Sequence, residues 1–145
     1  MWRALDLPPV WLALFALAGW GLVPALDPPA VWRWAGFLVL AAGLALMVWA
    51  ALTMRRARTT IIPGRRPEAL VTSGPFGYSR NPIYLADLLL FAGLMLASGR
   101  IAGLLLVPVL ALVLQQRFIR HEEEVIARAF PDAYSSYRQK VRRWI

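Results

Sequence analysis

Four long apolar stretches dominate this sequence and limit what it can fold into: residues 7–26, 34–54, 82–98 and 101–119. A helix that crosses the hydrocarbon core of a bilayer needs about 20 consecutive, mostly apolar residues. With 59% hydrophobic and 17% charged residues, the chain also differs from soluble domains, which are about 45–50% apolar and about 25% charged. We therefore expect an all-α integral membrane protein with four transmembrane helices.

The distribution of positive charge predicts how these helices are oriented. Fourteen of the sixteen basic residues are Arg3 or lie within 55–80 or 117–143, and only Arg33 and Arg100 lie in the other two loops. Because Lys and Arg accumulate in cytoplasmic loops, four spans place all the basic regions on one side, whereas three or five spans would not. We predict a multi-pass protein of the inner (plasma) membrane with both termini in the cytoplasm.

The remaining segments complete a single membrane domain over residues 1–145. The first apolar stretch is longer than the 7–15 apolar residues of a signal peptide, so we expect it to be retained. Residues 55–81 form a cytoplasmic loop. Between 120 and 145 the apolar residues recur at intervals of three or four, which is typical of amphipathic helices. Pro131 cannot lie in a helix interior, so two short helices should meet at Phe130 and Pro131.

Composition excludes several kinds of chemistry. The chain has no cysteine and a single histidine, His121, which argues against disulfides, thiolate catalysis and a Cys/His zinc site. A serine hydrolase would have to use His121, and no Gly-x-Ser-x-Gly motif precedes it. The net charge of +8 would suggest nucleic acid for a soluble protein, but the basic segments lack the interleaved aromatic residues of such surfaces. We expect neither a metal nor a nucleic-acid partner.

The third apolar stretch begins in a way that suits either a simple helix start or a ligand site. A turn-forming run, 74–77, precedes Asn81 and Pro82. Asn81 is a favourable N-cap, and Pro82 suits the first helical position. Free N–H groups at a helix N-terminus can also hold the carboxylate of an amino-acid-like ligand.

One acidic residue, Asp87, lies within this stretch. Ionisable groups inside a membrane are costly and usually face a bundle interior, a cavity or a partner. Asp87 follows Tyr84 by three residues, so the two share a helix face. The residues alone allow a role in a pocket or a structural hydrogen bond.

Three of the eight acidic residues come together in the run 121–124, where the fourth stretch ends. They could form a solvated turn that pairs with Arg117 and Arg120. Alternatively, one carboxylate turns inward and binds a polar ligand or a cation.

Two of these segments resemble motifs of one superfamily of integral membrane enzymes. The run Arg80-Asn81-Pro82-Ile83-Tyr84 resembles the Arg-His-Pro-x-Tyr motif of the isoprenylcysteine carboxyl methyltransferase and phospholipid methyltransferase superfamily. Glu122-Glu123-x-x-Ile126-x-x-x-Phe130, with Tyr134, Tyr137 and Val141 after it, resembles its second motif, Glu-Glu-x-x-Leu-x-x-x-Phe-Gly-x-x-Tyr-x-x-Tyr-x-x-x-Val. Upstream, Thr59, Thr60, Pro63 and the run 70–76 resemble the segment before the first motif, so the likeness covers about residues 59–144.

The resemblance implies that S-adenosylmethionine binds between the two motifs. The residues it implicates in cofactor binding are Leu70, Val71, Phe76, Asn81, Pro82, Ile83, Tyr84, Glu122 and Glu123. In some isoprenylcysteine-specific enzymes an arginine shortly before the Glu pair contacts substrate. Here the register gives Phe118, with Arg117 and Arg120 beside it as candidate substrate-binding residues. The chain departs from the family pattern at Phe76, Ala86 and Pro131, where Tyr, Gly and Gly are frequent.

The sequence therefore predicts a membrane methyltransferase that uses S-adenosylmethionine and acts on a lipid or lipophilic acceptor. That acceptor would be a phospholipid amine, or an isoprenoid-linked or other lipophilic carboxylate or thiol. Methyl transfer from a sulfonium needs alignment and exclusion of water more than a strong acid or base. Tyr84 and Asp87 are therefore expected to act as catalytic residues by orienting the acceptor, rather than as a strong acid or base. The alternatives are an inactive membrane scaffold and a small transporter subunit, although the second apolar stretch has no charged residue.

Overall fold

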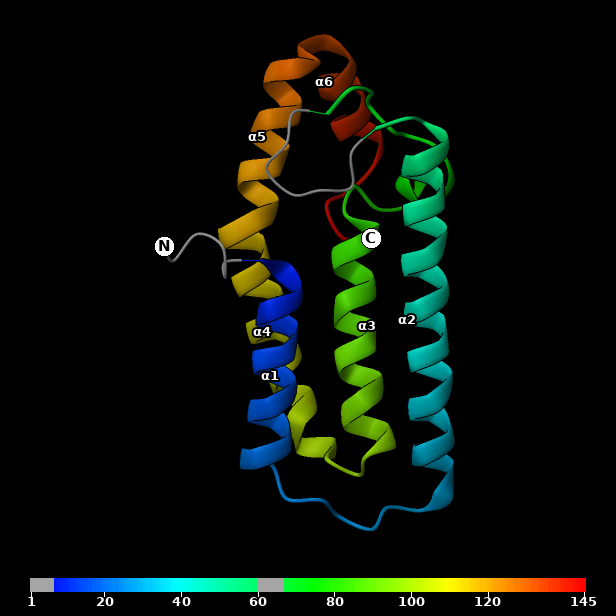
Figure 1. The fold of residues 1–145 in the computed structure, drawn as a ribbon, viewed down its shortest axis with the longest axis vertical. Coiled ribbons are helices and arrows are strands. Elements are labelled where there is room, and N and C mark those ends of the chain that lie inside the picture. Colours follow the sequence, from blue (N-terminus) through cyan, green and yellow to red (C-terminus); the bar gives the residue numbers. More distant parts are fainter. Residues whose placement is uncertain (1–6, 60–66) are drawn as a thin grey trace.

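The computed structural model of the protein describes residues 7–59 and 67–145, and the regular secondary structure of this part of the chain consists of helices alone (Figure 1). The predicted all-α class is confirmed for it. Arg3, Thr60 and Pro63, which entered the sequence argument, lie outside the described residues. The helices are α1 (Pro8–Leu22), α2 (Ala30–Arg56), η2 (Gly74–Gly77), α3 (Pro82–Ala97), η3 (Ile101–Leu105), α4 (Leu106–Leu114), the π-helix η4 (Gln115–Ile119), α5 (Arg120–Ala129) and α6 (Pro131–Lys140).

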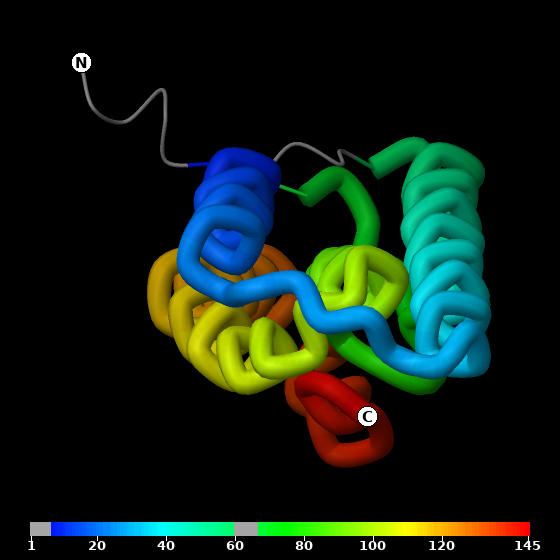
Figure 2. Tube along the Cα trace, turned by 90° about the horizontal axis from the view of Figure 1, so that it is seen from below, coloured from blue at the N-terminus to red at the C-terminus, as the bar shows by residue number. Residues whose placement is uncertain are grey.

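The long helices lie side by side as a bundle. Helix α3 is the central one, with α2 on one side and α1 and α4 on the other, as both views show (Figures 1 and 2). Helices α5 and α6 cover one end of the bundle, where α3 begins. That end also carries the two sequence motifs.

Two parts of the bundle are long and apolar enough to cross a membrane: α2, and the continuous helical run Ile101–Ala129. Helices α1 and α3 are apolar but shorter, with 15 and 16 residues. The outer face of α2 exposes bulky apolar side chains, among them Val31, Trp34, Leu38 and Leu44. Such a surface suits contact with lipid. The chain is therefore a helical membrane protein, and four membrane crossings remain a prediction.

Small residues allow α2 and α3 to pack closely. Gly36 and Gly43 of α2 and Gly93 of α3 are all buried. A Cβ atom on Gly93 would lie 2.6 Å from the backbone nitrogen of Leu40 and 2.9 Å from the carbonyl oxygen of Gly36. The two backbones touch here, as at the small-residue interfaces of membrane helices.

The fourth apolar stretch does not end as a regular helix. It passes through the π-helix Gln115–Ile119 into α5, which ends at Ala129. Phe130 leaves the helical conformation with φ −137°, and α6 starts at Pro131. The break lies at the two residues that the sequence predicts.

Replacing Gly93 with alanine should destabilise the bundle, because the added methyl group meets backbone atoms that cannot move aside. Overpacking of this kind costs about 1–3 kcal/mol. Gly21→Ala is the matched control, since a Cβ there meets nothing within 4 Å and alanine favours a helix. Thermal unfolding of the detergent-solubilised variants should give a lower Tm for Gly93→Ala only. Equal Tm values would mean that α2 and α3 are not in close backbone contact.

Candidate cofactor site

The two motifs meet where α3 begins, and Glu123 of α5 joins them. The Arg80 guanidinium donates from Nε to Glu123 Oε1 at 3.2 Å, and Asn81 Nδ2 donates to the same oxygen at 3.3 Å. From the C-terminal segment, Arg143 donates to Glu123 Oε2 at 2.7 Å. One carboxylate thus holds three separate parts of the chain together.

This carboxylate is buried, and its pKa reflects two opposing influences. The side chain of Glu123 is 11% exposed and that of Arg80 is 8% exposed. Burial alone would raise the pKa of Glu123, but the hydrogen bond from Arg143 and the charges of Arg80 and Arg143 outweigh it and lower the pKa below its usual value. The same hydrogen bond raises the pKa of Arg143. Glu123 is therefore ionised at neutral pH.

The C-terminal segment returns to the start of α3, where its main-chain carbonyl groups accept hydrogen bonds. The Arg80 N–H donates to the carbonyl oxygen of Arg142 at 3.0 Å, and the Ser79 hydroxyl donates to that of Arg143 at 3.3 Å. Asn81 Nδ2 also donates to the Arg143 carbonyl, at 3.2 Å. The predicted capping role of the Asn81 side chain is wrong: Asn81 occupies the N-cap position, but its side chain makes no capping hydrogen bond. It binds Glu123 and the C-terminal segment instead.

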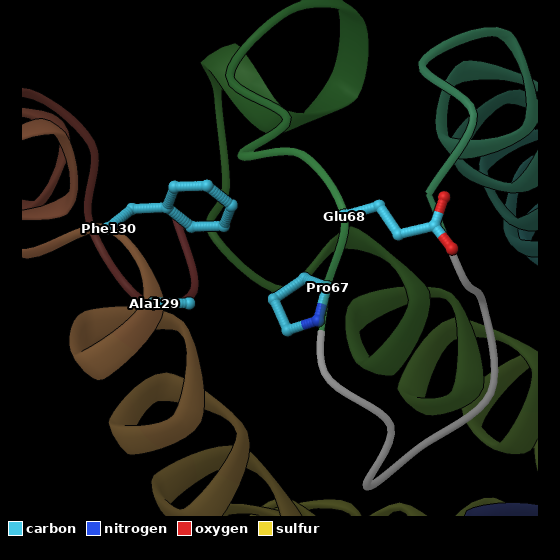
Figure 3. Close-up of a pocket in the computed structure, with 4 residues that line it drawn as sticks. All are labelled: Pro67, Glu68, Ala129 and Phe130. Carbon is cyan, nitrogen blue, oxygen red and sulfur yellow. The ribbon is translucent and has the colours of Figure 1, made fainter.

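A cavity of about 70 Å³ lies next to this cluster. Five of the predicted cofactor residues line it: Leu70, Val71, Phe76, Asn81 and Glu123. The other four, Pro82, Ile83, Tyr84 and Glu122, do not. A more open hollow of about 500 Å³, lined by Pro67, Glu68, Ala129 and Phe130, adjoins it, and Pro67 lines both (Figure 3).

Two tyrosines of α6 complete the wall of this cavity, and the sequence prediction did not include them. Tyr137 donates its hydroxyl to the carbonyl oxygen of Phe76 at 2.6 Å. Tyr134 is 5% exposed and packs edge-on against Tyr137, with ring centroids 6.3 Å apart. The sequence signal that could have identified them is their spacing. Residues three apart share a helix face, so both tyrosines reach the same wall of the cavity.

A second cluster, formed by Tyr84, Asp87 and Glu122, lies further along α3, on the helix face that Tyr84 occupies. The Tyr84 hydroxyl donates to Glu122 Oε1 at 2.7 Å, and its ring stacks on Phe118 with centroids 6.5 Å apart. Asp87 is 5% exposed and follows Tyr84 by three residues in α3, on the same face of the helix. The two predicted catalytic residues thus lie together, and Glu122 accompanies them rather than the cavity.

The predicted substrate-binding arginines lie elsewhere. Arg117 and Arg120 are both exposed, and the Arg117 guanidinium lies 5.0 Å from the ring centroid of Trp11 in α1. Neither arginine lines the cavity. Within residues 7–59 and 67–145, no three His, Asp or Glu side chains form a group that could hold a metal ion.

Comparison with known protein families decides the relationship that the motifs suggest. A sequence model described as phospholipid methyltransferase matches residues 31–133. The chain belongs to this family. The resemblance to the wider isoprenylcysteine carboxyl methyltransferase-like superfamily is thereby confirmed. The matched range includes Asn81 and Glu123, so the family match covers the centre of the cluster described above.

Two curated relatives match this phospholipid methyltransferase family member. It is 32% identical over 99 residues to the cobalt-zinc-cadmium resistance protein CzcN of Cupriavidus metallidurans. This matched region covers 68% of this chain and 45% of the relative. It is 31% identical over 74 residues to the nickel-cobalt-cadmium resistance protein NccN of Alcaligenes xylosoxydans xylosoxydans, covering 49% of this chain and 33% of the relative. The chain thus spans less than half the length of either. No solved structure matches it.

The Glu123 cluster should make the protein sensitive to acid. Because the folded-state pKa of Glu123 is lowered, its contribution to stability is present above the usual glutamate pKa of about 4.3 and is lost as the pH falls through the folded value. Glu123→Gln should lower stability at pH 7 by about 3 kcal/mol, the scale of breaking a buried ion pair. The loss of Tm from pH 7 to about 3.5 should be smaller in this variant than in the wild type.

Glu124→Gln is the control for this measurement, since Glu124 is exposed and pairs with exposed Arg128 at 3.2 Å. Its Tm should follow the wild-type pH curve. If Glu123→Gln followed the same curve, the cluster would not be the origin of the acid sensitivity.

Proposed function

We propose that this protein is an S-adenosylmethionine-dependent methyltransferase that acts on a lipid or lipophilic acceptor in the inner membrane. One observation carries the proposal. Five side chains to which the family resemblance assigns donor binding, from three separate parts of the sequence, line one cavity. The family to which the chain belongs supports the same activity.

The residues of the cavity fit a donor with a polar and an apolar part. Leu70, Val71 and Phe76 offer apolar walls, while Asn81 and Glu123 offer polar atoms. The cavity alone holds only a part of such a molecule, and the adjoining 500 Å³ hollow lies within the usual size of a ligand pocket, about 300–1,000 Å³. When bound, the donor supplies a methyl group on a sulfonium and leaves as a neutral thioether.

The second cluster suits the acceptor. Tyr84 and Asp87 lie within the first two turns of α3, and Glu122 accepts a hydrogen bond from Tyr84. Carboxylates at this point would stabilise an amine and take up the proton that it loses on methylation, and they would repel a carboxylate acceptor. We therefore favour a phospholipid amine or another non-anionic acceptor over an isoprenoid-linked carboxylate.

Donor binding and turnover should separate in the variant Asp87→Asn. The wild-type protein should bind S-adenosylhomocysteine and transfer labelled methyl groups to a lipid extract. Asp87→Asn should lower turnover at least tenfold, about 1.4 kcal/mol, because it removes the charge that orients the acceptor. Its affinity for S-adenosylhomocysteine should stay within about threefold, as expected for a group that acts on the acceptor or the transition state.

The two measurements have different consequences. Full turnover by Asp87→Asn, or a parallel loss of donor affinity, would remove Asp87 from the acceptor site. A wild-type protein that does not bind S-adenosylhomocysteine would overturn the methyltransferase proposal itself.

The proposal also requires that the site faces the cytoplasm, where the donor is made. With four crossings, the basic loop 55–81 and the segment after residue 119 lie on that side. A reporter fused after Ile145 that is active only outside the cytoplasm should give no signal, whereas the same reporter inserted at Gly99, between α3 and η3, should be active. The reverse pattern would contradict the four-span arrangement.

A second candidate function follows from the names of the two relatives, both of which are metal resistance proteins. On this hypothesis the chain is an inactive membrane scaffold or a small transporter subunit that contributes to metal resistance. The S-adenosylhomocysteine titration distinguishes the two candidates, because a scaffold of this kind has no need to bind the donor.

A further inference from the structure

The hydroxyl of Tyr134 is buried and makes no hydrogen bond to any of the described residues. Tyr134 lies in α6, and its side chain forms part of the wall of the 70 Å³ cavity. The whole residue is 5% exposed. Within the described part of the chain, its hydroxyl has no hydrogen-bond partner. Buried polar groups are almost always paired, so an unpaired one in a cavity wall calls for an explanation.

Tyr137 provides the comparison within the same wall. It lies one turn further along α6, packs against Tyr134 and lines the same cavity. Its hydroxyl is fully used, because it donates to the Phe76 carbonyl at 2.6 Å. Tyr137 therefore fixes η2 against α6, whereas Tyr134, which lines the same cavity, makes no such bond to the described residues.

We propose that the Tyr134 hydroxyl binds the methyl donor, by donating a hydrogen bond to an acceptor atom of its amino-acid or ribose part. This inference rests on the methyltransferase function proposed above and adds a binding residue to it. Tyr134 lines the same cavity as Asn81 and Glu123, so polar groups from the start of α3, from α5 and from α6 would surround one end of the ligand.

The protonation of Tyr134 agrees with a donor role. Burial, followed by the charge of Glu123, raises its pKa, and the charges of Arg80, Arg138 and Arg143 act against this rise without cancelling it. The phenol thus keeps its proton at neutral pH. A neutral phenol that finds no acceptor among residues 7–59 and 67–145 is available to donate to a ligand.

Tyr134→Phe removes only the oxygen atom and tests the inference directly. Without ligand, this variant should have a Tm equal to or above that of the wild type, because it removes an unpaired buried hydroxyl. Its Kd for S-adenosylhomocysteine should rise about tenfold. Tyr137→Phe should behave in the opposite way in the ligand-free protein and lower the Tm, because it loses the bond to Phe76. Ser136→Ala, at an exposed hydroxyl of α6, should change neither quantity.

Titration of 5′-methylthioadenosine, which lacks the amino-acid part, shows which half of the donor the hydroxyl contacts. A loss of affinity for both ligands assigns the bond to the ribose part, and a loss for S-adenosylhomocysteine alone assigns it to the amino-acid part. An affinity loss below about fivefold for both ligands, or a lower Tm of ligand-free Tyr134→Phe, would overturn the inference and leave the proposed function intact. If the wild-type protein bound neither ligand, the proposed function would fail, and the inference with it.

Discussion

The ion-pair cluster around Glu123 is the interaction on which the functional end of this protein depends. Helix α3 begins, α5 passes and the C-terminal segment returns at this one carboxylate, which Arg80 and Arg143 neutralise from two sides. A buried carboxylate with only one of these partners would be costly. The hydrogen bonds from the Arg80 N–H to the Arg142 carbonyl and from the Ser79 hydroxyl to the Arg143 carbonyl give the C-terminal segment a fixed position. The cavity wall that Asn81 and Glu123 form is therefore set by charge rather than by apolar packing alone.

The cluster also separates two neighbouring carboxylates into different surroundings. Successive residues of an α-helix point about 100° apart, so Glu123 faces the arginines and the cavity while Glu122 reaches Tyr84. A single turn of α5 thus contributes to both clusters. Under the proposed function, Glu123 belongs to the side of the water-soluble donor and Glu122 to the side of the lipid acceptor. The sequence pair Glu-Glu then has two roles rather than one.

Local rules predicted much of the fold, and long-range contacts account for what they missed. The apolar stretches correspond to α1, α2, α3 and the run from η3 to η4, and the Pro131 rule located the break before α6. Leu70, Val71, Phe76, Asn81 and Glu123 were brought into one site by the family resemblance, which carries information about contacts. Neither the local rules nor the family resemblance predicts that the segment after α6 folds back to the start of α3. The Asn81 side chain was therefore expected to cap α3, whereas it binds that segment. The unpaired state of Tyr134 likewise depends on what surrounds it in three dimensions.

Two departures from the family pattern, Phe76 and Pro131, leave the backbone hydrogen bonds at their positions intact. Phe76 lacks the hydroxyl that is frequent at its position, but Tyr137 binds its carbonyl oxygen, so the bond between η2 and α6 does not need that hydroxyl. Pro131 stands in place of glycine at the first position of α6, where its missing N–H is no loss. The helical bond from the Tyr134 N–H to the Phe130 carbonyl, at 2.8 Å, still forms, so both tyrosines keep their register on the cavity wall. These substitutions are therefore compatible with an intact cavity, and nothing in the geometry of the site requires the chain to be an inactive relative.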